Sequence, residues 1–192
     1  MNTLQAYILA GGHSSRMGQE KGLLLLNNKP LIQFVLDAVQ PLTDTITIIT
    51  NNKQYNTFGF TIMPDDIPNI GPAGAIATAL RHASAQRILV LSCDTPCLTT
   101  PALEFIVSQS LQTEITIPQY NKRLHPLCGV YNTSCRNQWQ QYITNGVYKV
   151  QDILNNFSCL FVTTDSHPHF TNNTFRNINT PQQLIELQQE FS

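Results

Sequence analysis

Residues 9–21 read Leu9-Ala10-Gly11-Gly12-His13-Ser14-Ser15-Arg16-Met17-Gly18-Gln19-Glu20-Lys21. An apolar run from Ala6 to Ala10 leads into this stretch and predicts a buried strand. The paired glycines that follow predict a loop whose backbone is open to a ligand, because successive N–H groups in such a turn form a concave anion site. Arg16 and Lys21 add the positive charge that phosphate oxygens require. The stretch therefore predicts a nucleoside triphosphate site at the edge of an α/β sheet.

The glycine spacing of this loop differs from the two commonest nucleotide fingerprints. A dinucleotide fold uses G-x-G-x-x-G, and a P-loop uses G-x-x-x-x-G-K-[ST]. Here the pair Gly11-Gly12 is followed by Gly18, and Lys21 lies three residues further on. The plain alternative is a tight turn after a first strand. The coincidence of a strand, a double glycine and two cations favours the phosphate site.

Length and composition limit the class of protein. A chain of 192 residues fits one domain, and we expect a single domain over residues 1–192. Hydrophobic residues make up 42% of the chain and charged residues only 12%, against a usual charged fraction of about 25%. The formal net charge of −1 argues against a partner that is a nucleic acid or a membrane surface. A phosphate site must then be a local feature.

The cysteines and the N-terminus favour a cytoplasmic protein. The five cysteines are an odd number, and the chain starts without a basic, signal-like segment. No apolar stretch reaches the roughly 18 residues of a membrane span. Zinc could be imagined at Cys93 and Cys97, with His125 three residues before Cys128, but the chain contains no C-x-x-C pair. Buried, unreactive thiols are the better interpretation.

The rest of the chain alternates strand and helix patterns. Strand patterns occupy residues 45–50, 60–63, 87–92, 114–118, 128–131 and 159–163. Helical patterns occupy residues 30–41, 73–83, 100–111, 133–145, 149–155 and the segment from 181 onward. The nearly continuous apolar run at 87–92 predicts a central parallel strand that is buried on both faces. The alternation predicts an α/β architecture.

Polar residues follow two of these strands at the end where ligands bind in such sheets. Asp94 comes directly after residues 87–92, a place where α/β nucleotide enzymes hold Mg²⁺. The alternative is that Asp94 caps the next turn. A phosphate loop needs a neutralising ion nearby, which favours the metal role. Asn51 and Asn52 follow the strand at 45–50, where they either line the ligand crevice or simply form a turn.

The second half of the chain offers candidates for a second substrate. His125 could contact that substrate, and Lys122 and Arg123 either attract its phosphate or lie on an exposed loop. Asn179 precedes Thr180-Pro181-Gln182-Gln183, a helix start with an N-cap, a proline at the first position and a capping box. Asn179 therefore lies on a loop before the last helix, where it either reaches a ligand or shapes the turn.

Five patches together resemble a known family. Residues 9–24, with the paired glycines and Lys21, look like the phosphate loop of nucleotidyltransferases, in the version typical of molybdenum cofactor guanylyltransferases. The later motifs of that family are matched by Gly71-Pro72-Ala73-Gly74, Cys93-Asp94-Thr95-Pro96, His125-Pro126-Leu127 and Asn177-Ile178-Asn179-Thr180-Pro181. The resemblance implies a Rossmann-like, three-layer α/β nucleotidyltransferase fold with a mostly parallel central sheet. It also implies Mg²⁺-dependent transfer of GMP from GTP to molybdopterin, with release of pyrophosphate.

The resemblance also assigns roles to individual residues. It implies that the nucleotide is contacted by Leu9, Ala10, Gly11, Gly12, Arg16 and Lys21. Arg16, Lys21 and Asp94 would be catalytic, with Asp94 as the Mg²⁺ ligand. Two further GTP contacts are ambiguous: Asn52 is preferred to Asn51, and Asp65 to Asp66. His125 and Asn179 would face molybdopterin, and proteins that deliver the cofactor or accept it would be partners.

Three rival functions remain at this stage. A sister enzyme would be a cytidylyltransferase for molybdopterin or another small phosphorylated acceptor, because the phosphate loop cannot choose the base. Sugar-phosphate nucleotidyltransferases usually have a longer chain. A nucleotide-binding regulatory protein without turnover would not need both Lys21 and Asp94.

Overall fold

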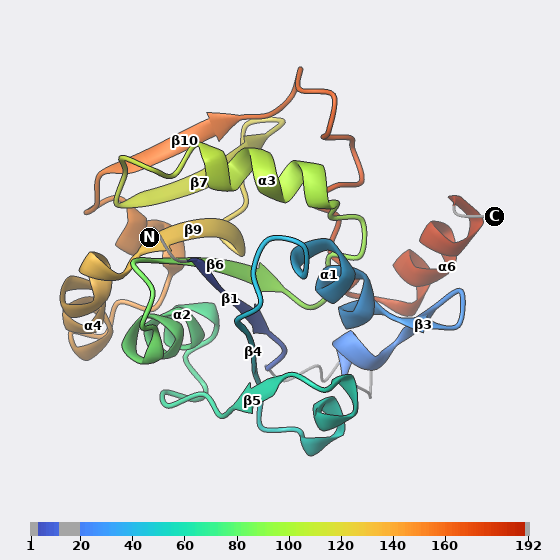
Figure 1. Cartoon of the computed structure of the whole chain (residues 1–192), viewed down its shortest axis with the longest axis horizontal. Helices are drawn as coiled ribbons and strands as arrows, with labels where there is room; N and C mark the ends of the chain where they lie inside the picture. The colour runs from blue at the N-terminus through green and yellow to red at the C-terminus, as the bar shows by residue number, and fades with distance from the viewer. Residues whose placement is uncertain (1–3, 12–19, 191–192) are drawn as a thin grey trace.

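The computed structural model describes residues 4–11 and 20–190. A mixed sheet runs through the middle of the molecule in the order β10-β7-β9-β6-β1-β4-β5, with β8 paired to β7 (Figure 1). Its strands are β1 (Leu4–Leu9), β4 (Ile46–Ile49), β5 (Thr61–Met63), β6 (Arg87–Ser92), β7 (Ile115–Tyr120), β8 (Arg123–Leu124), β9 (Cys128–Asn132) and β10 (Cys159–Thr163). The short strands β2 (Leu25–Leu26) and β3 (Lys29–Pro30) form a separate hairpin.

Parallel pairing dominates the sheet around its central strands. β1 pairs in parallel with both β4 and β6, β4 with β5, and β7 with β10. β9 runs antiparallel to both of its neighbours, β6 and β7, and β8 folds back antiparallel on β7. The expected mostly parallel α/β sheet is confirmed. The central strand at 87–92 has one parallel and one antiparallel neighbour rather than two parallel ones.

Helices cover both faces of the sheet. The helices and 3₁₀ turns are α1 (Leu31–Val39), α2 (Pro72–His82), α3 (Thr100–Ser108), α4 (Arg136–Thr144), α5 (Val150–Leu154), α6 (Pro181–Glu190), η1 (Lys21–Leu23), η2 (Lys53–Phe58) and η3 (Thr133–Cys135). One core joins α1 and α3 to the sheet, and a second core joins α2, α4 and α5 to its other face. Ala6 and Ile8 belong to the first core and Tyr7 to the second, because successive strand side chains alternate in direction. The three-layer arrangement is therefore confirmed.

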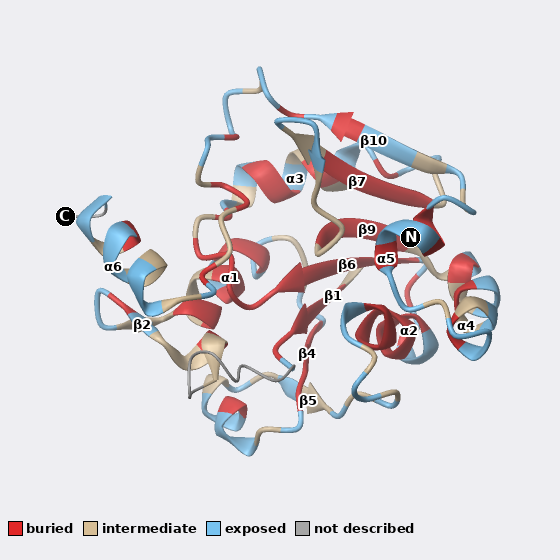
Figure 2. Ribbon diagram, turned by 180° about the vertical axis from the view of Figure 1, so that it is seen from behind, coloured by how far each residue is buried: buried red, intermediate tan, exposed pale blue. Residues whose placement is uncertain are grey.

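Burial follows the same plan. The strands β1 and β6 are buried along most of their length, whereas α6 is exposed over most of its surface (Figure 2). A small third core, formed by Leu26, Leu31, Ile178 and Leu187, attaches α6 to the β2–β3 hairpin. Because Ile178 belongs to this core, the contact positions the segment of chain just before α6.

The helix at 100–111 is shorter than its sequence pattern predicts. It ends at Ser108, and Leu111 lies beyond it with 61% of its surface exposed. Arg87 at the start of β6 binds this end of the helix: its Nη1 donates to the Ser110 hydroxyl at 2.6 Å and to the Val107 carbonyl at 3.3 Å. The Val107 carbonyl also accepts from the Ser110 N–H at 3.1 Å, so the guanidinium and the backbone both satisfy this carbonyl of the last turn.

Helix α4 clamps α2 against the sheet at both ends. Arg136 donates from Nε to the Leu80 carbonyl at 2.6 Å and from Nη2 to the Ala83 carbonyl at 2.8 Å. The buried indole of Trp139 donates to the Ala73 carbonyl at 3.0 Å, near the start of α2. The orientation of α2 is therefore fixed by side chains that come from far along the sequence.

Replacing Arg136 by alanine is expected to lower the free energy of unfolding by about 2–3 kcal/mol. The variant loses charge-assisted hydrogen bonds and leaves two carbonyls at the end of α2 without these donors. Urea unfolding followed by circular dichroism would measure the change. Arg81→Ala is the matched control, because Arg81 forms an exposed ion pair with Asp66 and such pairs contribute less than about 1 kcal/mol. Equal losses in the two variants would contradict the clamp.

Among the residues that the structure describes, none of the helices is long and apolar enough to cross a membrane.

Candidate active site

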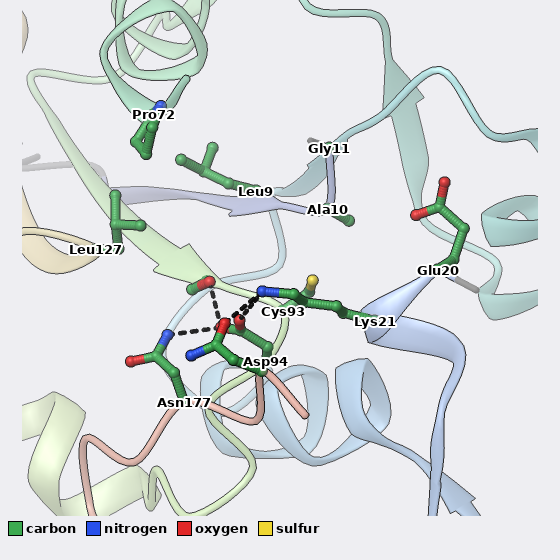
Figure 3. Close-up of a pocket in the computed structure, with 12 residues that line it drawn as sticks. Leu9, Ala10, Gly11, Glu20, Lys21, Pro72, Cys93, Asp94, Leu127 and Asn177 are labelled. Atoms are coloured by element: carbon green, nitrogen blue, oxygen red, sulfur yellow. Dashed lines mark hydrogen bonds and ion pairs between the residues drawn. The ribbon is translucent and has the colours of Figure 1, made fainter. Parts of the chain in front are cut away.

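A pocket opens where β1 and β6 end side by side (Figure 3). The two strands are parallel and in register, with Leu9 opposite Ser92, so the residues that follow each strand meet at one edge of the sheet. The backbone closes this edge further, because the N–H of Cys93 donates to the Leu9 carbonyl at 3.2 Å. The described residues that line the pocket are Leu9, Ala10, Gly11, Glu20, Lys21, Pro72, Ser92, Cys93, Asp94, Leu127, Asn177 and Asn179.

Asp94 lies at the base of the pocket and is only 5% exposed. Its Oδ1 accepts hydrogen bonds from the Ser92 hydroxyl at 2.6 Å and from the Asn177 side-chain amide at 2.7 Å. Its Oδ2 faces the Lys21 ammonium at 3.5 Å. Among the hydrogen bonds of the described residues, none runs from a backbone N–H to this carboxylate. The alternative in which Asp94 merely caps the next turn therefore finds no support.

Lys21 reaches the pocket from η1, on the side opposite Asn177 (Figure 3). Its ammonium bridges two parts of the chain, because it donates to Oδ1 of Asn179 and also faces Asp94. The Lys21 side chain is about one-third exposed. The ammonium thus contacts two side-chain oxygen atoms, one from Asn179 and one from Asp94.

The donor set of the pocket fits Mg²⁺ only when a substrate contributes ligands. Among the described residues, no group of three or more His, Cys, Asp or Glu side chains is placed to hold a metal ion. Mg²⁺ is commonly bound through one or two carboxylates together with substrate phosphates and water. Asp94 supplies one such carboxylate, and within residues 4–11 and 20–190 its Oδ2 is engaged only by the 3.5 Å contact with Lys21. The site therefore suits an ion shared with a nucleotide.

The loop that carries Asn177 and Asn179 is held by three separate contacts. Between them, Ile178 is fully buried, and its N–H donates to the Asp94 carbonyl at 3.0 Å. The expected capping box at the start of α6 forms in part: the Gln183 N–H donates to the Thr180 hydroxyl at 3.2 Å, but the Gln183 side chain bonds one residue before Thr180. The Gln183 side chain accepts from the Asn179 N–H at 2.8 Å.

The structure brings some of the sequence-predicted site residues together and leaves others apart. The pocket lining includes Leu9, Ala10, Gly11, Lys21, Asp94 and Asn179. Gly12 and Arg16 lie outside the described residues. Asn52, Asp65 and His125 are not among the residues that line the pocket. Their predicted contacts with substrates, like the roles of the pocket residues, stay predictions.

Asn52 and Asp65 both stabilise their own segments. The Asn52 side chain accepts from the Gln54 N–H at 2.9 Å and so caps η2. The Asp65 carboxylate accepts from the Thr78 hydroxyl at 2.8 Å and from the Ile67 N–H at 3.0 Å. These contacts tie the loop before α2 to the helix itself, whose first residue lines the pocket. The competing residue Asp66 instead pairs with Arg81 and His82.

His125 packs against an aromatic ring. Its imidazole stacks on Phe175, with ring centroids 4.1 Å apart and planes inclined by 13°. Burial, with a smaller contribution from the Arg123 charge, lowers the pKa of His125 from 6.5 to about 4. The ring is therefore neutral near pH 7. It joins the segment before β9 to the loop that leads to Asn177. Lys122 and Arg123 are both exposed, at the β7–β8 turn.

Replacing His125 by phenylalanine is expected to reduce the acid sensitivity of the fold. Between pH 6.5 and pH 4 the unfolded chain binds a proton at His125 and the folded chain does not, so stability falls as the pH drops through this window. The variant lacks this proton uptake. Melting temperatures at pH 7 and pH 5 should therefore differ less in His125→Phe than in the wild type. His169→Phe, at an exposed position, is the control and should follow the wild type. An unchanged difference in His125→Phe would contradict the prediction.

Sequence reasoning missed Asn177, which holds the Asp94 carboxylate directly. The signal was present, because Asn177-Ile178-Asn179 alternates polar, apolar and polar residues. In extended chain such residues point to alternate sides, so burying Ile178 places both amides on the other side. Ser92, Glu20, Cys93, Pro72 and Leu127 also line the pocket without having been predicted individually.

Comparison with known sequences agrees with this geometry. A model of the MobA-like NTP transferase domain matches residues 6–160. The chain is 34% identical to the probable molybdenum cofactor guanylyltransferase of Flavobacterium johnsoniae, covering 97% of each chain. It is 30% identical to the molybdenum cofactor guanylyltransferase of Shewanella piezotolerans, covering 96% of this chain and 92% of the other.

Solved structures share the fold at lower identity. Molybdopterin-guanine dinucleotide biosynthesis protein A from Archaeoglobus fulgidus matches with a TM-score of 0.82 and 23% identity, over 97% of this chain and 98% of the other. A 4-diphosphocytidyl-2C-methyl-D-erythritol synthase from Anaerococcus prevotii matches with a TM-score of 0.77 and 9% identity, over 98% and 95%. The fold is thus common to several nucleotidyltransferases, and the sequence matches specify the branch: the chain belongs to the MobA-like NTP transferase family.

Proposed function

We propose that this protein transfers GMP from GTP to molybdopterin, forming the guanine dinucleotide form of the molybdenum cofactor and releasing pyrophosphate. The observation that carries the proposal is the pairing of Lys21 with Asp94 in one pocket, at the ends of two adjacent parallel strands. The names of relatives that are 30–34% identical over nearly the whole chain support guanylyl transfer in molybdenum cofactor biosynthesis.

The reaction requires little covalent chemistry from the protein. An oxygen of the terminal phosphate of molybdopterin attacks the α-phosphorus of GTP in line. The bond from this phosphorus to the bridging oxygen breaks, and pyrophosphate leaves with the electron pair. The attacking phosphate is already anionic, so no general base is needed. Positioning and neutralisation of charge then supply the rate enhancement.

Each pocket residue has a role in this scheme. Lys21 exchanges Asn179 and Asp94 for phosphate oxygens, where its charge offsets the negative charge of the leaving pyrophosphate. The Gly11 backbone, which follows β1, lies open to the nucleotide. Asp94 would hold Mg²⁺, which neutralises charge on the bound triphosphate. Asn177 keeps the Asp94 carboxylate oriented, and Asn179 faces molybdopterin.

The fold does not select the nucleotide base, because the 4-diphosphocytidyl-2C-methyl-D-erythritol synthase shares it. A thermal-shift panel with GTP, CTP, ATP and UTP in the presence of Mg²⁺ tests the choice of base. We expect GTP to raise the melting temperature most, since a ligand at 100 times its Kd adds about 2.7 kcal/mol of stability. Preferential stabilisation by CTP would replace the guanylyl proposal by the cytidylyl one.

The acceptor is tested by product release. Pyrophosphate should appear from GTP only when molybdopterin is added, and release without any acceptor would contradict the proposed transfer. Proteins that deliver molybdopterin or receive the finished cofactor belong to the same proposal.

All five cysteines are free thiols, which supports our proposal that the enzyme works in the reducing cytoplasm.

A further inference from the structure

The segment that carries Lys21 rests on a buried tyrosine from another part of the chain. Tyr55 lies in η2 and has no exposed surface. Its hydroxyl donates to the Glu20 carboxylate at 3.5 Å and packs directly against Gly22. Both residues that flank Lys21 therefore contact one phenolic oxygen.

Gly22 fits into a narrow space between Tyr55 and Cys93. A Cβ atom at Gly22 would lie 2.7 Å from the tyrosine hydroxyl oxygen and 3.2 Å from both Cβ and Sγ of Cys93. Real Cβ atoms essentially never approach another atom as closely as the first of these distances. The backbone beside Lys21 is thus confined from two sides, and one of them is the residue that precedes Asp94.

Tyr55 is itself held firmly. Its N–H donates to the Asn52 carbonyl at 3.3 Å, and Asn52 caps the same 3₁₀ turn with its side chain. The ring belongs to the core that contains α1 and packs near Phe58, at a centroid distance of 6.1 Å. Desolvation raises the pKa of the Tyr55 hydroxyl well above 10, so it stays protonated and able to donate. A side chain that is locked in this way can hold the backbone that it contacts in one position.

We propose that Tyr55 is a positioning residue for the transfer reaction, holding the backbone at Gly22 so that Lys21 points at the Asp94 pocket. This inference rests on the proposed function. Tyr55 does not line the pocket in the described part of the chain, so it acts through Lys21 rather than by touching the substrates.

A double-mutant cycle between Tyr55→Phe and Lys21→Ala tests the inference. Initial rates of pyrophosphate release from GTP, Mg²⁺ and molybdopterin would be measured for all four proteins, well below each melting temperature. We expect Tyr55→Phe to lower kcat about tenfold, with less than a threefold change in the KM for GTP. In the Lys21→Ala background the same substitution should change kcat less than twofold, because neighbouring groups that act as a unit are not additive.

Two outcomes would overturn the inference. One is full activity of Tyr55→Phe. The other is a loss of kcat on Tyr55→Phe substitution that is equal in the wild-type and Lys21→Ala backgrounds, because such a loss indicates a general structural role. Thr57→Val, which removes an exposed hydroxyl from the same turn, is the matched control and should keep the wild-type kcat. If Tyr55→Phe folds poorly, Gly22→Ala replaces it, because the added Cβ atom disturbs the same contact from the other side. Gly22→Ala should lower kcat in the wild-type background and leave it nearly unchanged in the Lys21→Ala background. Failure of the proposed function gives a different result, namely no molybdopterin-dependent pyrophosphate from the wild type.

Discussion

Asp94→Asn is expected to lower kcat for pyrophosphate release by about 10³-fold or more, while the protein stays folded. Asparagine keeps an oxygen that can accept from Ser92 and Asn177, so the packing of this buried position is preserved. It removes the negative charge that faces Lys21 and that would hold Mg²⁺. The loss should therefore appear in turnover, with little change in the melting temperature measured without nucleotide.

Titration with Mg²⁺ separates the metal role from a packing role. Thermal shifts with GTP should depend on Mg²⁺ in the wild type and much less in Asp94→Asn. Asp37→Asn is the matched control, because Asp37 is a carboxylate on the surface of α1 paired with Lys29, away from the pocket. Activity of Asp94→Asn near the wild-type level would remove Asp94 from the metal site.

Lys21→Ala is expected to lower kcat/KM about 100-fold, a loss of ~3 kcal/mol of transition-state stabilisation. The ammonium is the one cation among the described residues that line the pocket, and it faces Asp94 at 3.5 Å. Removing it leaves the negative charge on the leaving pyrophosphate without this partner. Steady-state kinetics with varied GTP at saturating molybdopterin would measure the effect.

Lys29→Ala provides the control for the loss of a lysine. Lys29 pairs with Asp37 on the surface and lies over the Phe34 ring, and it is not among the described residues that line the pocket. Its replacement should leave kcat/KM within about twofold of the wild-type value, because an exposed ion pair contributes little to the stability of the fold. A small effect of Lys21→Ala, comparable to that of this control, would remove Lys21 from the proposed mechanism.

Local sequence patterns were sufficient for the elements and for half of the pocket. The apolar runs at 6–10 and 87–92 predicted strands that the structure confirms, and the residues after them, Gly11 and Asp94, meet in one pocket. Adjacent parallel strands necessarily end at the same edge of a sheet. Alternation of helices and strands was likewise enough to predict an α/β architecture, whereas the three layers were implied by the family resemblance.

Other contacts in and around the pocket join residues far apart in sequence. The alternation at 177–179 places Asn177 beside Asn179, but only the fold shows that Asn177 reaches Asp94. Only the fold shows that His125 stacks on Phe175. Asn52 was singled out for its place at a strand end, yet its side chain caps the turn that holds Tyr55. A polar residue at a strand end suits a ligand and a cap equally well, and only its neighbours in space decide between them.

The sequence by itself determined where a phosphate loop and a carboxylate stand along the chain, because glycine spacing, charge and strand periodicity are local properties. The tertiary structure alone decided what supports them. Tyr55 confines Gly22 beside Lys21, and the loop at 177–179, which contacts Asp94, shares a core with α6 and the β2–β3 hairpin. Such supports depend on side-chain shape and on packing across the whole fold, which no short stretch of sequence encodes.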